Sequence, residues 1–139
     1  MNTLRAALIP GLISGIISVL TSWLWMGVIF HRYQRETPQT WRPEGGGSYF
    51  AASALHLLAA IGISCLTVLM IRFHAGIFAE GIFANLRFAF CLWIAIALPI
   101  LLESAVFVRL HPLVVLGQLL DWLTTSVVAC AITGWWMSR

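Results

Sequence analysis

Four long apolar stretches dominate the pattern of hydrophobic and polar positions along this chain. They cover residues 7–30, 48–71, 83–108 and 113–137. An α-helix rises about 1.5 Å per residue, so about 20 mostly apolar residues are enough to cross the hydrocarbon core of a bilayer. The pattern therefore predicts an all-α fold in which residues 1–139 form one integral membrane domain, a four-transmembrane-helix antiparallel bundle.

The segments between these stretches differ in character. Residues 31–47 are the one plainly polar part of the chain, and Pro38 and the run Gly45–Gly47 exclude a continuous helix there. The connection over residues 72–85 contains the tandem GIFAE–GIFAN and predicts a turn at the membrane interface. The connection over residues 109–112 is short, so we expect it to join the last two spans as an antiparallel hairpin. Its turn would lie on the same side of the membrane as the 31–47 loop.

Composition agrees with a membrane protein. Of the 139 residues, 60% are hydrophobic and 9% are charged, whereas a soluble domain carries about 25% charged residues. The net charge of +3 comes from eight basic residues, all arginines, spread along the chain in ones and twos. A nucleic-acid-binding protein would gather such charges on one face. We therefore expect the chain to interact with the lipid bilayer and not with nucleic acid.

The arginines also bear on orientation, because cytoplasmic loops carry an excess of basic residues. Here the two sides are balanced. Arg5, Arg72, Arg87 and Arg139 flank one side, and Arg32, Arg35, Arg42 and Arg109 flank the other. The first span has its more basic flank at its C-terminal end. We therefore expect a bacterial inner-membrane protein with the 31–47 loop in the cytoplasm.

Small residues and tryptophans indicate how the spans pack and where they meet the interface. Gly11 and Gly15 form a small-xxx-small pair that lets another helix approach closely, while Pro99 is expected to kink the third span. We expect helix contacts at Gly11, Gly15, Pro99 and Gly117. Tryptophan is enriched at membrane–water interfaces, so we expect interface anchors at Trp25, Trp41, Trp135 and Trp136.

Ionisable residues in three spans fall at a similar predicted depth. His56 lies about eight residues from the loop side of the second span, Glu103 about seven before the tight turn and Asp121 about nine after it. The helical rise places all three roughly 10–13 Å inside the same membrane face. Ser22 of the first span lies at this level, and Gln118 shares a helix face with Asp121. We expect the five residues to form an intramembrane polar layer that faces the bundle interior.

Three interpretations of this layer stay open. Its groups can hydrogen-bond to one another and fasten helix to helix. They can instead relay protons or ions inside a small transporter. Finally, His56, Glu103 and Asp121 could ligate a metal, although no HxxE or HxxxH spacing supports that interpretation. We expect no metal and no cofactor.

The remaining reactive residues do not suggest catalysis. Cys65, Cys91 and Cys130 lie inside the predicted spans, share no CxxC spacing and are expected to be small buried hydrophobic residues. No Ser–His–Asp, Cys–His or paired-carboxylate arrangement is placed where water and a polar substrate would reach it. Nothing in the sequence therefore argues for an enzyme.

Two functions remain. The first is a small integral-membrane scaffold or accessory subunit that acts through helix packing, as a homo-oligomer or within a larger membrane complex. The alternative is a proton-coupled transporter of a small or lipophilic compound. The balanced arginines and the acidic residues of the polar layer favour that alternative.

Several local patterns occur together in this chain. They are Trp23-Leu24-Trp25 before a basic loop that ends at Arg42, Glu80-Gly81 at the start of the third span, and Gly117 to Trp122 followed by Gly134-Trp135. In these features the chain resembles a bacterial domain-of-unknown-function family of small four-span integral membrane proteins, over about two thirds of its length. The resemblance implies an architecture, and it carries over no site residues.

Overall fold

The computed structural model describes residues 3–42, 44–73 and 81–139, and these residues are largely helical. The predicted interfacial turn of the GIFAE–GIFAN tandem falls mostly on residues 74–80, which lie outside the described residues. In chain order the elements are α1 (Thr3–Ser22), η1 (Trp23–Ile29), α2 (His31–Gln34), η2 (Pro38–Thr40), α3 (Gly46–Arg72), α4 (Gly81–Leu92), η4 (Trp93–Ala97), α5 (Leu98–Phe107) and α6 (Pro112–Met137).

The predicted four-span, all-α architecture is confirmed. Within the described residues, four continuous helices are long and apolar enough to cross a membrane: Leu4–Ile29, Gly46–Arg72, Gly81–Phe107 and Pro112–Met137. Two of these spans are not α-helical throughout. The first ends in the π-helix η1, and the third contains the π-helix η4 between α4 and α5.

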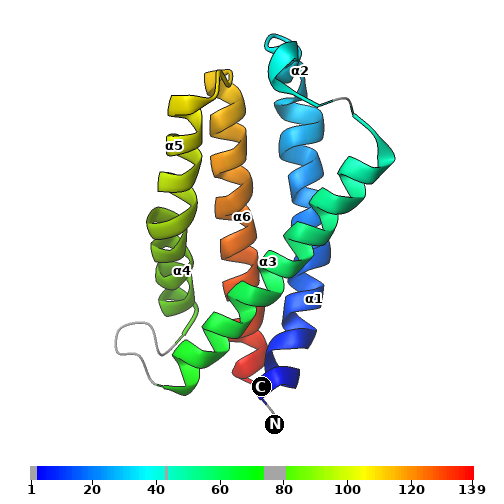
Figure 1. The fold of residues 1–139 in the computed structure, drawn as a ribbon. Helices are drawn as coiled ribbons and strands as arrows, with labels where there is room; N and C mark the ends of the chain where they lie inside the picture. The colour runs from blue at the N-terminus through cyan, green and yellow to red at the C-terminus, as the bar shows by residue number, and fades with distance from the viewer. Residues whose placement is uncertain (1–2, 43, 74–80) are drawn as a thin grey trace.

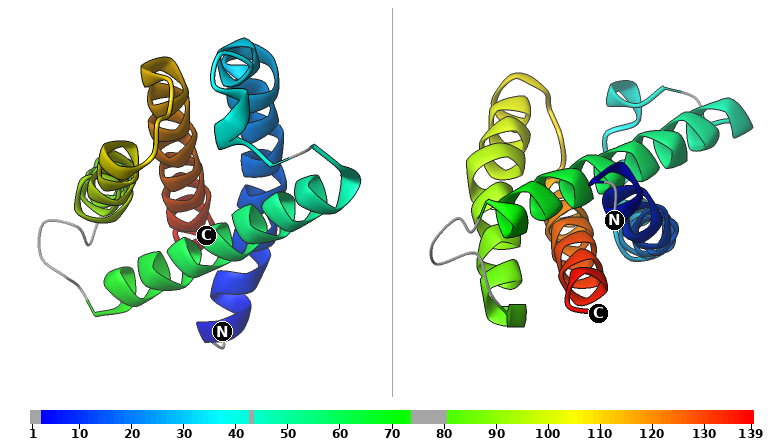
Figure 2. Two further views of the ribbon diagram at one scale, coloured as in Figure 1. Left: turned by 45° about the horizontal axis from the view of Figure 1, so that its top comes forward. Right: turned by 90° about the horizontal axis from the view of Figure 1, so that it is seen from below.

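Helix α6 lies at the centre of the arrangement. It runs between α1 on one side and the α4–η4–α5 span on the other, and α3 crosses this layer obliquely (Figures 1 and 2). Helix α3 packs against both α1 and α6, while α4 packs mainly against α6. The two chain ends lie at the same end of the molecule (Figure 1). Asp121, near the middle of α6, is therefore within reach of side chains from α1 and α3.

The distribution of side chains is the reverse of that in a soluble protein. Large apolar residues such as Ile16, Leu20, Phe50 and Leu58 are exposed, while the interior is rich in alanine, serine and threonine. In lipid, no hydrophobic force draws large side chains together, so small and hydroxyl residues that permit close packing line the helix contacts. The fully buried hydroxyl residues are Ser14, Ser18, Ser64, Thr67, Thr125 and Thr133.

The expected roles of three glycines are confirmed. A Cβ atom added at Gly11 would lie 2.9 Å from the Cα atom of Ile61 on α3, and one at Gly15 would overlap the side chain of Leu57. These two residues therefore let α1 and α3 touch backbone to backbone. On α6, a Cβ at Gly117 would lie 2.7 Å from the ring of Phe30.

The expected helix contact at Pro99 is wrong, because Pro99 is exposed near the start of α5. Proline lacks an N–H and its ring clashes with the carbonyl group four residues earlier. That carbonyl belongs to Ala95, inside the π-helix η4. The wider π turn accommodates the ring at this point. Burial of Cys91 is also wrong, since this residue is exposed, whereas Cys130 is buried and Cys65 is partly buried.

The loop after the first span folds over the tight turn between α5 and α6. The ring of Tyr33 stacks on His111 with centroids 5.0 Å apart, and the Glu36 carboxylate lies 3.2 Å from Nε2 of His111. The Thr40 hydroxyl donates a hydrogen bond to the carbonyl oxygen of Arg109 at 3.2 Å. The loop and the tight turn therefore lie at the same end of the bundle, in agreement with the prediction that they share one side of the membrane.

Candidate functional site: a buried His–Asp–Ser network

Three spans meet at the carboxyl group of Asp121, whose side chain is 5% exposed. Its Oδ2 atom lies 3.0 Å from Nε2 of His56 on α3. The same oxygen accepts a hydrogen bond of 2.8 Å from the hydroxyl group of Ser22, the last residue of α1. Ser22, His56 and Asp121 are referred to below as the polar network, and their predicted convergence is confirmed.

The surroundings of His56 determine where its protons lie. Its Nδ1 atom is 3.1 Å from the carbonyl oxygen of Ala52, one turn earlier on α3. A carbonyl oxygen can only accept, so Nδ1 carries a hydrogen. At Nε2, either the imidazole donates to an Asp121 carboxylate or it accepts from a protonated Asp121. In both states one proton lies between the two side chains, and it links α3 to α6.

Aromatic side chains enclose this contact. The His56 ring stacks on Trp122 with centroids 5.2 Å apart and planes inclined by 19°. One turn further along the first span, the indole N–H of Trp25 donates to the Thr124 hydroxyl at 3.2 Å. That hydroxyl in turn donates to the carbonyl oxygen of Leu120 at 2.8 Å. Trp25 therefore links η1 to α6, and its expected role as an interface anchor stays a prediction.

Glu103 is not part of the network, so its expected place in the interior is wrong. It is exposed on α5 and forms no hydrogen bond or ion pair with a residue that the structure describes. The expectation rested on the depth of Glu103, which does not determine the direction of its side chain. In a regular α-helix, Glu103 would lie about five turns after the buried Asn85 and on the same face. The π-helix η4 interrupts that periodicity, and each extra residue in a π turn rotates the following helix by about 100°.

The other expected residues are distributed as follows. Gln118 lies one turn before Asp121 on α6 and is partly buried, without a side-chain hydrogen bond inside the described ranges. Trp135 and Trp136 lie at the end of α6, where Arg139 stacks over Trp135 at 3.6 Å. Trp41 lies in the loop and donates its indole N–H to the Thr37 hydroxyl at 3.2 Å. Their function as interface anchors stays a prediction.

Sequence reasoning missed Trp122 as a member of the site. Trp122 follows Asp121 directly, so on a straight α6 it points about 100° away from the carboxyl group. It still reaches His56, and the reason is that α3 crosses α6 obliquely (Figure 2). His56 on α3 therefore contacts both Asp121 and Trp122. Nothing in the periodicity of either span indicates such a crossing angle.

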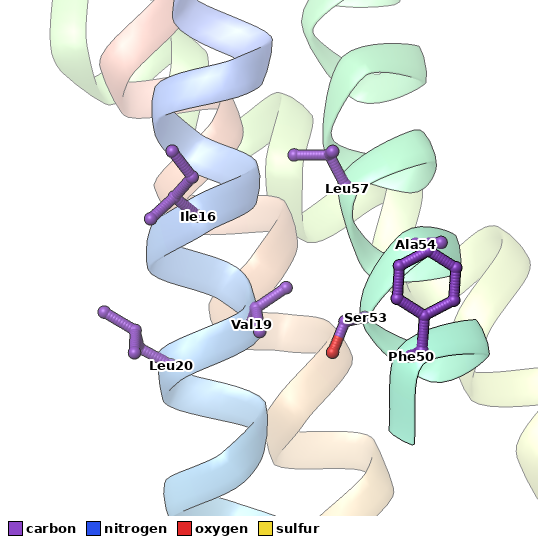
Figure 3. Close-up of a pocket in the computed structure, with 7 residues that line it drawn as sticks. All are labelled: Ile16, Val19, Leu20, Phe50, Ser53, Ala54 and Leu57. Atoms are coloured by element: carbon purple, nitrogen blue, oxygen red, sulfur yellow. The ribbon is translucent and has the colours of Figure 1, made fainter. Parts of the chain in front are cut away.

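Two outward-facing grooves lie apart from the polar network. One, of about 360 Å³, lies between α1 and α3 and has Ser53 as its one polar lining residue (Figure 3). The other, of about 380 Å³, lies between α5 and α6 and is lined by Leu102, Ala105 and neighbouring apolar residues. Because both open on faces rich in exposed apolar side chains, they suit lipid acyl chains.

The network is not a ligand set for a metal. Across residues 3–42, 44–73 and 81–139, no three His, Cys, Asp or Glu side chains gather closely enough to hold a metal ion. The three-residue set considered from the sequence required Glu103, which lies on the outside of α5. What the observed arrangement can do is join three helices and hold one proton between His56 and Asp121.

In comparisons with known proteins, no family model matches the chain, and no curated protein or solved structure is significantly similar to it. The predicted resemblance to a four-span family stays a prediction.

Proposed function

We propose that this chain is a small integral-membrane scaffold or accessory subunit, and that it associates through the exposed face of the α4–η4–α5 span. The observation that carries the proposal is the carboxyl group of Glu103 on that face. The protein is then a pre-assembled packing unit. Its polar network holds three spans together, and the fourth presents a surface for assembly. We further expect the unit to lie in a bacterial inner membrane with the 31–47 loop in the cytoplasm.

The third span is the least buried of the four. The most apolar 18-residue window of this helix has no buried residue, whereas 44% of the corresponding window of α6 is buried. Its α4 half packs on α6 through Ala84, Asn85 and Ala89, and in η4 the Trp93 indole donates to the Leu119 carbonyl oxygen at 2.8 Å. Its α5 half has no buried residue. The open face is therefore mainly that of α5.

The carboxyl group of Glu103 on this face needs a hydrogen-bonding partner, which lipid acyl chains do not supply. It lies about 6 Å inside the end of α5 by helical rise. A charged side chain costs about 2.5–3.5 kcal/mol at the centre of a transmembrane helix and less toward its ends. A second copy of the chain supplies a partner at the same depth, because a two-fold axis that runs along the membrane normal, beside the exposed face of α5, brings the two carboxyl groups together. One shared proton then satisfies both.

The test is the monomer–dimer equilibrium in lipid bilayers, measured by single-molecule photobleaching over a range of protein densities. Hydrogen bonds between transmembrane helices contribute about 1 kcal/mol, so Glu103→Leu should weaken dimerisation about fivefold. Glu103→Gln, which keeps donor and acceptor atoms, should retain most of it. Ser104→Ala is the matched control, because that exposed hydroxyl bonds only to the Ile100 carbonyl oxygen of its own helix.

A wild-type protein that stays monomeric at all densities would rule out the second copy as the partner. A Glu103→Leu variant with unchanged dimerisation would show that the carboxyl group does not drive assembly.

The alternative function is proton-coupled transport, and the observation that favours it is the proton held between His56 and Asp121. The corresponding test uses the purified protein in liposomes with an imposed pH gradient and a panel of lipophilic cations. A transporter would couple proton flux to their uptake, and Asp121→Asn would abolish the coupling. The scaffold proposal predicts no coupled flux from either protein.

A further inference from the structure

Three buried polar atoms lack a hydrogen-bond partner among the described residues: Oδ1 of Asp121, Oγ of Ser18 and Oγ1 of Thr125. Asp121 is 3% exposed, and the other two residues are fully buried. Buried polar atoms in native proteins almost always have a partner, either protein or ordered water. Three orphan atoms in a small bundle therefore point to something that the protein atoms alone do not supply.

The three atoms lie along one helix contact. The hydrogen bond from Ser22 to Asp121 sets the register of α1 against α6, and these helices run in opposite directions (Figure 1). Ser18 lies four residues before Ser22, and Thr125 lies four residues after Asp121. Both steps lead toward the same end of the bundle. Ser18 and Thr125 are therefore level with each other, about 6 Å beyond the Ser22–Asp121 bond.

The hydroxyl groups of Ser18 and Thr125 make no hydrogen bond to a carbonyl oxygen of their own helices. Serine and threonine in membrane helices usually donate to a carbonyl oxygen three or four residues earlier. Thr124 and Ser126 do so, to Leu120 and Trp122, at 2.8 and 2.9 Å. Thr125, between them, makes no such bond although it is fully buried. Its hydroxyl is free to bind something between the helices.

We propose that an internal water molecule is bound between α1 and α6, held by Asp121, Ser18 and Thr125. Atoms one helical turn apart are separated by the length of two successive hydrogen bonds of about 2.8 Å each. A water at that point donates a hydrogen bond to Oδ1 of Asp121 and forms hydrogen bonds with the hydroxyl groups of Ser18 and Thr125. It then has three partners, the usual number for a buried water. It extends the polar network by a full turn along α6.

A cation suits the same position less well. Calcium takes six to eight oxygen ligands, and here one carboxylate oxygen and two hydroxyls converge. The charge of Asp121 is already matched by the proton it shares with His56, so a cation would leave an uncompensated positive charge in the membrane interior. Water satisfies the three atoms without adding charge.

The first test compares two threonine-to-valine changes on α6. Replacing an orphan hydroxyl by a methyl group of the same shape is neutral or stabilising, whereas removing one that binds water leaves the water's other partners unsatisfied. We expect Thr125→Val to lower the melting temperature in detergent by roughly 3–6 °C, and Thr125→Ser to restore it. Thr133→Val is the matched control, because this buried hydroxyl donates to Ser64 at 2.9 Å and its loss must destabilise.

A Thr125→Val variant that melts at or above the wild-type temperature, beside a destabilised Thr133→Val, would overturn the proposal. A second measurement detects the water itself. Water-edited solid-state NMR should transfer magnetisation from bound water to the Thr125 methyl group in the wild type and not in Ser18→Ala/Asp121→Leu. Absence of transfer in the wild type would overturn the proposal as well.

Cation dependence provides the third readout. Melting curves in sodium, lithium, potassium and choline chloride at one ionic strength should coincide if water is the ligand. A rise specific to one cation that disappears in Asp121→Asn would mean that an ion occupies the position, and the water proposal would fail.

Discussion

At the scale of single residues, Asp121 and His56 depend on each other. The carboxyl oxygen that meets His56 lies in a buried position where few other donors reach it. Ser22 alone would remain if the imidazole were removed. Conversely, His56 is held on its other side by the Ala52 carbonyl oxygen and covered by Trp122, so it cannot swing away to a new partner. The pair behaves as a unit.

This dependence predicts that removing one partner is worse than removing both. His56→Ala leaves a buried carboxyl group without its proton-sharing partner and should destabilise the protein by about 3 kcal/mol. The double change His56→Leu/Asp121→Leu replaces the pair by apolar groups and should destabilise it less. Unfolding by SDS titration in mixed micelles measures both free energies.

The control for that experiment is His31→Ala. His31 pairs with Glu44 at 3.7 Å in the exposed loop, and surface ion pairs contribute about 0–1 kcal/mol. Additive effects of His56→Ala and Asp121→Ala in a double-mutant cycle would contradict the coupling of the pair.

At the scale of elements, the contact between α1 and α3 depends on the absence of side chains at Gly11 and Gly15. The atom nearest to an added Cβ at Gly11 is the backbone Cα of Ile61, which cannot move without shifting α3. The position of α3 in turn sets the position of His56, which lies on the same helix. The glycines of α1 thus act on the polar network through the path of α3.

We therefore expect Gly11→Ala to destabilise the protein by roughly 1–3 kcal/mol, the usual effect of overpacking a close contact. Gly62→Ala is the matched control, because a Cβ at Gly62 on α3 meets nothing within 4 Å. That change should stabilise α3 by about 0.5–1 kcal/mol, since alanine is the better helix former. Thermal unfolding in one detergent compares the two. Equal effects of the two changes would show that α1 and α3 are not in backbone contact.

At the scale of the whole molecule, the exposed apolar shell and the shared end of the two termini define how the bundle lies in a membrane. Both ends of the chain lie opposite the loop that covers the tight turn (Figure 1). An even number of spans requires this arrangement. The orientation of the bundle follows from the arginine-flanked end of the first span and is part of our proposal.

The orientation leads to a labelling prediction. Gln39 lies exposed in the loop, and Arg139 is exposed at the end of the chain. With the loop in the cytoplasm, Arg139→Cys should react with a membrane-impermeant maleimide in intact cells, and Gln39→Cys should react only after the cells are opened. The reverse pattern would invert the proposed orientation. Labelling of both sites from the same side would contradict the four-span arrangement itself.

The sequence by itself determined the four spans and the depths of Ser22, His56 and Asp121. Hydrophobic length and the constant rise of a helix convert position in the chain into depth in the membrane. The tight approach at Gly11 and Gly15 followed from the same kind of local pattern, because only a small residue lets a second helix come so close.

Only the tertiary structure decided which way each residue faces. The direction of a side chain depends on rotation about the helix axis. The π-helix η4 before Pro99 changes that rotation, so Glu103 lies outside. The regular helices α3 and α6 keep His56 and Asp121 inside. The stacking of Trp122 on His56 depends on the oblique path of α3, which packing between distant helices sets. Depth is a property of one helix and can be counted along the chain. Direction is a property of the whole bundle.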